Sequence, residues 1–461
     1  MRSLFLLGVY CSFFIFGLRA PHILVLGYVW VDIFTPQLIS YGILTEVPVS
    51  MLLGVAILLS LARLPSSPDV KLRLVTILVG LLSIWMTASL AWAVLPDAAY
   101  IKWNWAIKSV AFSCLVPFFF RNRVQIESLI WIIVLSGMGH CIPFGTKILV
   151  SGGGYGRSLG LIQVNTGYGE SSMLAVFAVT LVPMCLYLQR HTVLFKPTKL
   201  YKLVLLGFMV AAILTALGTY ARAGLIAIGV FGALMFVVSR RKWIFLAVAI
   251  TFSLGVGTFM GEAWTQRMGT IVEAGEETSA MTRVGVWMWT LEYVARHPLG
   301  GSFDMYRINS IGIVMKDGSL LQDTGRAFHS IYFEMLGELG LPGLFIYLAI
   351  VAAVLLTLHR VRRRANTPER EWMRSLCDAL MISGIAFLAG GAFIGVGFNS
   401  YFYYIGAAAA AMANILDRSV READEAAALP QSGGLPGAAG PGVQQPAMMS
   451  ARRRALGTSR E

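Results

Sequence analysis

The stretch Gly325-Arg-Ala-Phe-His329-Ser-Ile-Tyr-Phe-Glu334-Met-Leu-Gly-Glu338-Leu-Gly-Leu-Pro-Gly343-Leu-Phe joins the longest polar segment of the sequence to an apolar one. Residues 261–328 form the polar segment before it, and residues 344–358 after it are apolar. Histidine exchanges a proton near neutral pH, so a histidine at this boundary suits chemistry at a membrane surface. His329 is therefore the first candidate functional residue.

The composition identifies a membrane protein. Of the 461 residues, 57% are hydrophobic and only 13% are charged, against roughly 25% charged residues in a soluble domain. Apolar runs long enough to cross a bilayer recur along the chain, and alternation typical of strands is absent. Because a helix satisfies its own backbone in hydrocarbon, we predict an all-α polytopic membrane protein.

Thirteen apolar runs are candidate spans, and prolines interrupt several of the early ones. We expect about 12 transmembrane helices, with one of the first three runs broken or re-entrant. The runs are residues 4–18, 22–38, 49–61, 74–95, 103–120, 126–142, 172–188, 203–219, 225–238, 244–260, 331–359, 379–392 and 401–416.

Lysine and arginine fall in every second loop, which fixes the expected orientation. These basic loops are residues 63–73, 121–123, 190–202, 240–242 and 360–374, and we assign them to the cytoplasm. The large loop 261–328 then lies on the opposite, periplasmic face. Within it, residues 282–296 predict a helix along the membrane surface, with Val284, Trp287, Leu291 and Val294 on one face.

The chain thus divides into four expected parts. They are an N-terminal transmembrane bundle over residues 1–260, the periplasmic loop 261–328, C-terminal transmembrane helices over 329–416, and a disordered cytoplasmic tail over 417–461.

The net charge of +13 and the five cysteines do not indicate further ligands. The positive residues follow the loop pattern of a membrane protein, so we expect membrane lipids as partners and no nucleic acid. The cysteines lie in or beside apolar runs and form no ligand cluster. We expect no metal and no cofactor.

Two arginines on the predicted outward face are candidate anion ligands. Arg222, in Tyr220-Ala-Arg222-Ala-Gly224, lies in a short turn between two spans, where an arginine is costly unless it meets an anion or water. Arg283 is expected in the first turn of the surface helix, where its charge opposes the helix dipole unless both receive an anion. For Arg222 the alternative is an arginine at a helix end whose side chain extends to the membrane interface. For Arg283 the alternative is an ordinary exposed arginine.

Four further residues are possible supporting groups. Glu334 and Glu338 follow His329 by one to two helical turns and are expected to orient it. Tyr220 precedes Arg222, and Arg157 ends the glycine-rich run Gly152-Gly-Gly-Tyr-Gly156. That run lacks the strand and helix of a phosphate loop and is better explained as a flexible loop. Lys102 is expected at the interface or facing the bundle.

The sequence around His329, with its later Glu and Gly-Leu-Pro-Gly-Leu, resembles the C-terminal signature of the O-antigen ligase and O-antigen polymerase superfamily. Tyr220-Ala-Arg222-Ala-Gly-Leu resembles its arginine turn, and Arg283 with Trp287 and His297-Pro-Leu-Gly resembles the helix of its large periplasmic loop. Arg19-Ala-Pro21, Phe34-Thr-Pro36 and Tyr41-Gly42 are similar to O-glycosylation ligases associated with exosortase systems.

The resemblance implies a GT-C-like, metal-independent glycosyltransferase in the bacterial inner membrane, active on the periplasmic face. Such an enzyme takes a glycan from an undecaprenyl-pyrophosphate carrier and passes it to a lipid, protein or glycan acceptor. We expect Arg222 and Arg283 to bind the pyrophosphate and His329 to serve the acceptor hydroxyl. Two alternatives stay open: a polymerase of the same superfamily, and a transporter or flippase of carrier-linked glycans.

Overall fold

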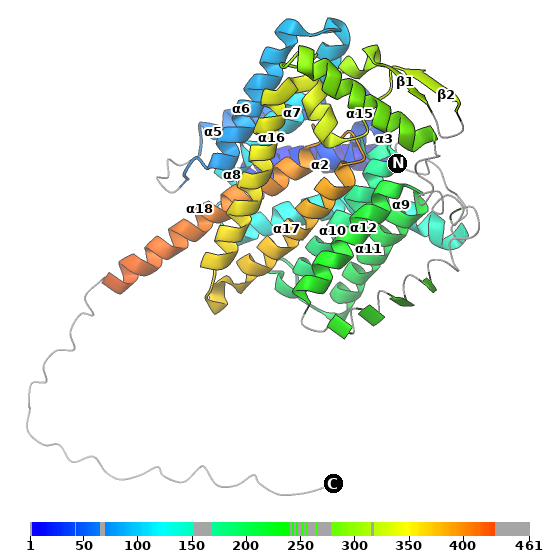
Figure 1. Cartoon of the computed structure of the whole chain (residues 1–461). Coiled ribbons are helices and arrows are strands. Elements are labelled where there is room, and N and C mark those ends of the chain that lie inside the picture. The colour runs from blue at the N-terminus through cyan, green and yellow to red at the C-terminus, as the bar shows by residue number, and fades with distance from the viewer. Residues whose placement is uncertain are drawn as a thin grey trace, which may run out of the picture. The chain divides into compact units, whose positions relative to one another are not determined.

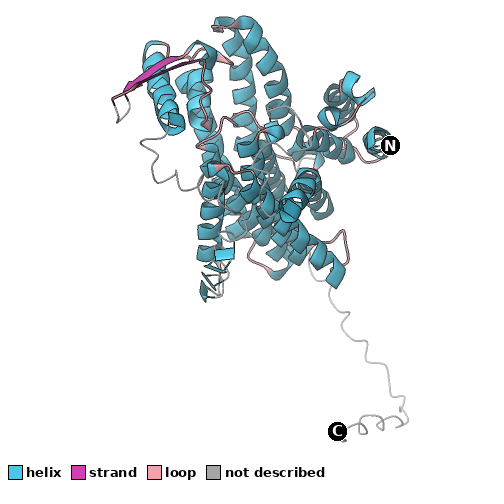
Figure 2. Ribbon diagram, turned by 90° about the vertical axis from the view of Figure 1, so that its right-hand side faces the viewer, coloured by secondary structure: helices cyan, strands magenta, loops and turns pink. Residues whose placement is uncertain are grey.

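The structure is a computed structural model. It describes residues 2–41, 43–64, 70–151, 167–239, 242–243, 246–247, 250–251, 254–255, 264, 278–314 and 318–428. Contacts divide the chain into two units, Met1–Arg418 and Ser419–Glu461. Everything that follows concerns the first unit, which is a bundle of helices with one small hairpin (Figures 1 and 2).

Helices account for nearly all the regular structure of the described residues. They are α1 (Arg2–Gly17), α2 (His22–Phe34), α3 (Pro36–Ile39), α4 (Ile43–Glu46), α5 (Val49–Leu61), α6 (Leu74–Ala88), α7 (Pro96–Ser113), α8 (Val116–Phe119), α9 (Arg123–Ser151), α10 (Ser171–His191), α11 (Lys199–Gly218), α12 (Arg222–Val238), α15 (Thr278–Arg296), α16 (Ile331–Arg364), α17 (Glu371–Gly391) and α18 (Ser400–Ala428). Short 3-10 turns cover Ser89–Trp92, Gly167–Gly169, Met305–Ile308 and Pro368–Arg370.

Six helical segments of the described chain are long and apolar enough to cross a membrane, and four shorter helices are also apolar. This confirms the class of an all-α membrane protein, while the count of about 12 spans stays a prediction. The run expected at 244–260 lies largely outside the described residues. The last helix continues to Ala428, beyond the predicted end of the final span at 416, and residues 429–461 are not described.

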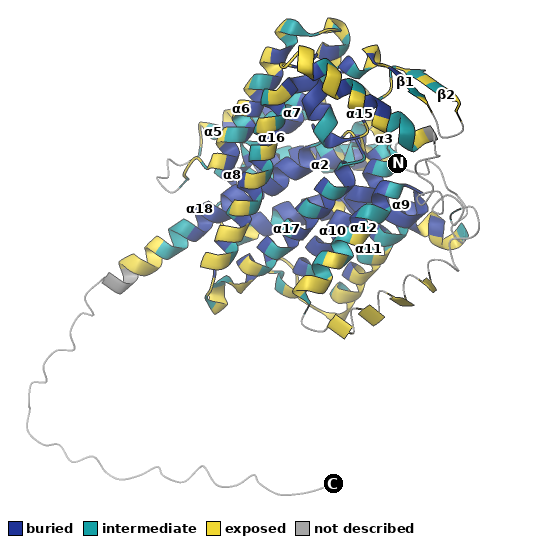
Figure 3. Ribbon diagram, in the orientation of Figure 1, coloured by how far each residue is buried: buried dark blue, intermediate teal, exposed yellow. Residues whose placement is uncertain are grey.

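Helix α10 is the centre of the bundle. It packs against α9, α11, α12 and α17, and its residues are buried on all sides, as Figure 3 shows. A helix that is apolar all round belongs inside a bundle. By contrast, α6 and α11 leave large apolar side chains exposed, among them Ile84, Leu200 and Leu203. Such exposed apolar faces fit contact with lipid tails.

A helix and a β-hairpin precede α16 in the chain. The helix predicted over 282–296 is present as α15, and it packs against strand β1 (Ser310–Val314), which pairs antiparallel with β2 (Leu320–Thr324). The sequence analysis missed this hairpin. Two five-residue strands are marginal by themselves, and contact with α15 stabilises them: Ile313 lies so close to Gly285 that an added Cβ would stand 2.5 Å from it.

Helix α16 is kinked at Gly340, where the backbone has φ 66° and ψ −168°. Pro342 cannot donate the hydrogen bond that the Glu338 carbonyl would accept in a helix. Ser302 supplies that donor from its backbone N–H at 2.8 Å, and Gly301 donates to the Gly337 carbonyl at 2.9 Å. The Gly-Leu-Pro-Gly sequence thus opens the helix, and residues of the preceding loop satisfy the freed carbonyl groups.

We predict that Gly340→Ala destabilises the protein by about 2 kcal/mol or more, because its φ and ψ suit only glycine and a Cβ would stand 2.3 Å from the carbonyl oxygen of Pro298. Reversible unfolding of purified protein in lipid-detergent micelles measures the change. The control is Gly207→Ala in α11, where a Cβ meets nothing within 4 Å. Equal stability of the two variants would contradict the structural role of the kink.

Candidate active site

His329 lies directly before α16 with a left-handed backbone, φ 47°. Trp287 of α15 fixes the chain on both sides of it. Its indole N–H donates to the Phe328 carbonyl at 2.8 Å, and its ring stacks on Phe333 with centroids 5.0 Å apart. Phe328 is buried, whereas the side chain of His329 is exposed. The histidine is therefore held at its backbone and remains accessible at its ring.

Charged groups from other elements act on the imidazole. Loss of hydration and then the positive charge of Arg283 lower the pKa of His329 below its usual value, while the negative charge of Glu170 opposes this change. A lowered pKa keeps the ring neutral and able to accept a proton. The structure thus brings Arg283 and His329, two of the predicted site residues, within electrostatic range, and adds Glu170.

Glu170 caps the start of α10. Its carboxylate accepts hydrogen bonds from the backbone N–H groups of Ser172, at 3.2 Å, and Met173, at 2.9 Å. The sequence analysis noted Glu170 only as the end of the glycine-rich segment. Glu170 comes near His329 only through the packing of α10, and no local sequence pattern reveals that packing. Arg157, from the same segment, lies outside the described residues.

Arg222 is the first residue of α12 and is half-buried. Gly224, two residues after Arg222, packs closely against α10. A Cβ added to Gly224 would stand 2.8 Å from the Cβ of Ala175 in α10. Because Ala175 lies little more than one turn after Glu170, Arg222 and Glu170 lie at the same end of the bundle. Tyr220 adopts φ 56° and packs with Leu174 and Leu217, which fixes the turn before Arg222.

The position of Arg283 differs from the prediction. The sequence analysis placed it in the first turn of its helix, but α15 already begins at Thr278. The argument from the helix dipole is therefore wrong for Arg283, since the dipole's effect is confined to the first turn. It applies instead to Arg222, which is the first residue of α12, a helix whose N-terminus no side chain caps.

The carboxylates expected to orient His329 bind a lysine instead. The Lys102 ammonium lies 2.8 Å from Glu334 Oε1 and 2.7 Å from Glu338 Oε1. Asp304, 3.8 Å from Lys102, donates its backbone N–H to Glu338, and Gly397 does so to Glu334. No hydrogen bond joins either glutamate to His329 in the described chain. They support the site by fixing the first turns of α16.

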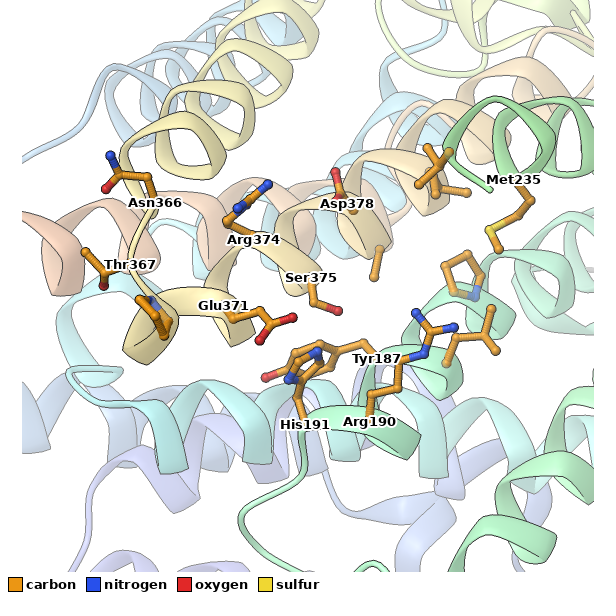
Figure 4. A pocket seen from close by; sticks show the side chains of 16 residues that line it. Tyr187, Arg190, His191, Met235, Asn366, Thr367, Glu371, Arg374, Ser375 and Asp378 are labelled. Carbon is orange, nitrogen blue, oxygen red and sulfur yellow. The ribbon is translucent and has the colours of Figure 1, made fainter. Parts of the chain in front are cut away.

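A cavity of ≈740 Å³ lies elsewhere (Figure 4). Its lining comes from the last residues of α10 and α12 and from the start of α17. Helix α10 runs from beside Glu170 to His191, and α16 runs from His329 to the loop before α17. The cavity is therefore at the opposite end of the bundle from His329 and is no part of this site.

Metal ligands are not grouped in the described residues, where no cluster of three or more His, Cys, Asp or Glu side chains could hold an ion. The charged groups that act on His329 are Arg283, Glu170, Arg326 and Glu334. Arg222 lies at the same end of the bundle as Glu170. Arginines are suited to anion binding, and a neutral histidine can accept a proton.

The fold and the site define a helical membrane protein with a cationic, histidine-bearing end. Residues 207–348 match the O-Antigen ligase family, and this range contains Arg222, Arg283 and His329. Residues 1–193 match a family of unknown function, DUF5935. The first of these matches confirms the predicted resemblance to the O-antigen ligase superfamily, while the resemblance to exosortase-associated ligases stays a prediction. A search of curated proteins found no match.

We predict that Arg283→Gln raises the pKa of His329 and Glu170→Gln lowers it, because the first removes a positive charge and the second a negative one. Labelling of His329 with diethyl pyrocarbonate, followed over pH by mass spectrometry, reports the neutral imidazole. At acid pH the first variant should label more slowly than wild type and the second faster. Arg296→Gln, exposed at the end of α15, is the control. If Arg283→Gln and Glu170→Gln both moved the pKa of His329 in the same direction, this electrostatic arrangement would be contradicted.

We predict that Lys102→Met costs about 3–5 kcal/mol of stability, because it leaves two buried carboxylates without their cation. Adding Glu334→Gln and Glu338→Gln to it should restore part of the loss. Arg364→Gln breaks a more exposed ion pair, 2.7 Å from Asp417, and should cost no more than about 1 kcal/mol. Denaturant unfolding compares the three; equal losses for Lys102 and Arg364 would refute the importance of the buried cluster.

Proposed function

We propose that this membrane glycan ligase is an oligosaccharide ligase that transfers a glycan from an undecaprenyl-pyrophosphate carrier to a protein or lipid acceptor. The observation that supports this most is the placement of Arg283 and Glu170 within electrostatic range of an exposed His329. Arg283 and His329, with Arg222, lie in the part of the chain that matches the O-Antigen ligase family, whereas Glu170 lies in the part that matches the family of unknown function.

The reaction needs positive charge at the leaving group. The acceptor oxygen forms a bond to the anomeric carbon, and the bond from that carbon to the carrier phosphate breaks. The pyrophosphate keeps the electron pair and departs as an anion that needs no proton. Arg222 and Arg283 stabilise this growing negative charge by bidentate hydrogen bonds, and the N-terminus of α12 adds to their effect.

The acceptor side needs a base. As its oxygen attacks, the acceptor hydroxyl gives its proton to a ring nitrogen of His329, which is neutral because its pKa is lowered. Glu170 then stabilises the imidazolium that forms. In this proposal Tyr220 supports Arg222 through the turn, and Glu334 and Glu338 support His329 through Lys102.

We further propose that the site faces the periplasm from the bacterial inner membrane. The opposite end of the bundle supports this orientation, because α16 ends there in Arg362, Arg363 and Arg364 and α10 ends in Arg190 and His191. Basic residues of this kind favour the cytoplasmic side.

We predict that Arg222→Ala, Arg283→Ala and His329→Ala each lower the transfer rate about 100-fold or more, as loss of a transition-state donor or a general base does. The assay is transfer from a defined carrier-linked glycan by purified protein in lipid nanodiscs. Arg296→Ala, on the same helix as Arg283 but exposed, should keep wild-type activity.

Normal transfer by all three variants would overturn the site. The product decides between ligase and polymerase: a strain without a ligase accumulates long carrier-linked chains, whereas one without a polymerase makes single repeat units. Movement of the carrier-linked glycan across liposomes without a new glycosidic bond would instead support a flippase.

A further inference from the structure

The cavity at the end of the bundle away from His329 has an ordered polar mouth. Figure 4 shows Arg190 extending from α10 into the gap toward α12, and Glu371 of α17 pointing toward His191. Arg374 and Asp378 line the cavity from α17. The volume of ≈740 Å³ is that of a small-molecule site.

The cavity has an apolar part on its inner side. Pro183 and Leu186 lie farther from the end of α10 than Arg190 does, and Ile382 lies farther into α17 than Glu371, Arg374 and Asp378 do. Pro183 precedes Arg190 by seven residues of α10, which is about 10 Å along a helix. A ligand that fills this space must therefore have a polar end and an apolar end, separated by about 10 Å along the direction of α10.

Three of the charged groups at the mouth are not paired with one another. Asp378 is already bound by Arg362, at 2.5 Å. Arg190, Arg374 and Glu371 form no ion pair among the described residues, although all three line one cavity. A phosphate group would meet the two guanidinium groups, and a primary ammonium group would meet the Glu371 carboxylate.

We propose that this cavity binds a glycerophospholipid with a phosphoethanolamine headgroup. Arg190 and Arg374 hold the phosphate, Glu371 holds the ammonium, and an acyl chain lies along Pro183, Leu186 and Ile382. A purely anionic headgroup fits less well, since it offers no partner for Glu371 and is repelled by it. This lipid site does not depend on the proposed ligase activity, because its residues and those around His329 lie at opposite ends of the helices.

Native mass spectrometry of the full-length protein tests this with phosphatidylethanolamine and phosphatidylglycerol at matched concentrations. Wild-type protein should retain phosphatidylethanolamine preferentially. Arg190→Gln should weaken its binding about tenfold, the effect of losing a charge-assisted hydrogen bond. Glu371→Gln should remove the preference for phosphatidylethanolamine over phosphatidylglycerol. Arg363→Gln, a basic residue of the same end that does not line the cavity, is the control and should bind as wild type.

Three outcomes would overturn the lipid site. One is equal weakening in the Arg190 and Arg363 variants, which would show a nonspecific charge effect. Another is unchanged lipid preference in Glu371→Gln. The third is displacement of the lipid by water-soluble glycerophosphoethanolamine at equal concentration, which would show a site for a free phosphate ester. Circular dichroism of each variant confirms that it is folded before binding is compared.

Discussion

The buried ion cluster of Lys102 with Glu334 and Glu338 is the interaction on which the site end of this protein depends. It joins α7 to α16, and the glutamates also receive the backbone N–H groups of Asp304 and Gly397. Buried charges are costly unless each is paired and hydrogen-bonded. The cluster meets this condition only when four separate segments lie together, so it specifies the position of α16 and thereby of His329.

The kink in α16 provides a second set of contacts between α16 and the loop that follows α15. Opening the helix at Gly340 leaves carbonyl groups without a helical donor. Gly301 and Ser302 donate to two of them, and the Trp85 indole donates to the Leu339 carbonyl at 2.9 Å. The loop between α15 and the 3-10 turn Met305–Ile308 is therefore held against α16 by backbone hydrogen bonds as well as by charge. Since α15 also contributes Trp287 beside His329, the arginine of α15 is positioned by the same elements that position the histidine.

The apolar helices and the location of His329 could be predicted from the sequence, because hydropathy and loop charge are local properties. The cluster could not be predicted. Glu334 and Glu338, four residues apart, share a helix face, but their partner Lys102 lies 232 residues from Glu334 in the chain. Glu170 was missed as a neighbour of His329 for the same reason. The start of α15 was misplaced, since the helix already includes Thr278, and Arg283 was therefore assigned to the wrong turn.

The central claim is that Arg222, Arg283 and His329 serve one pyrophosphate-binding site. A cryo-electron microscopy structure of the protein with bound undecaprenyl pyrophosphate tests it most directly. The account predicts density for the pyrophosphate within hydrogen-bonding distance of both Arg222 and Arg283, with His329 beside the position of the departing sugar. Pyrophosphate density at the opposite end of the bundle, or density that contacts neither arginine, would contradict it.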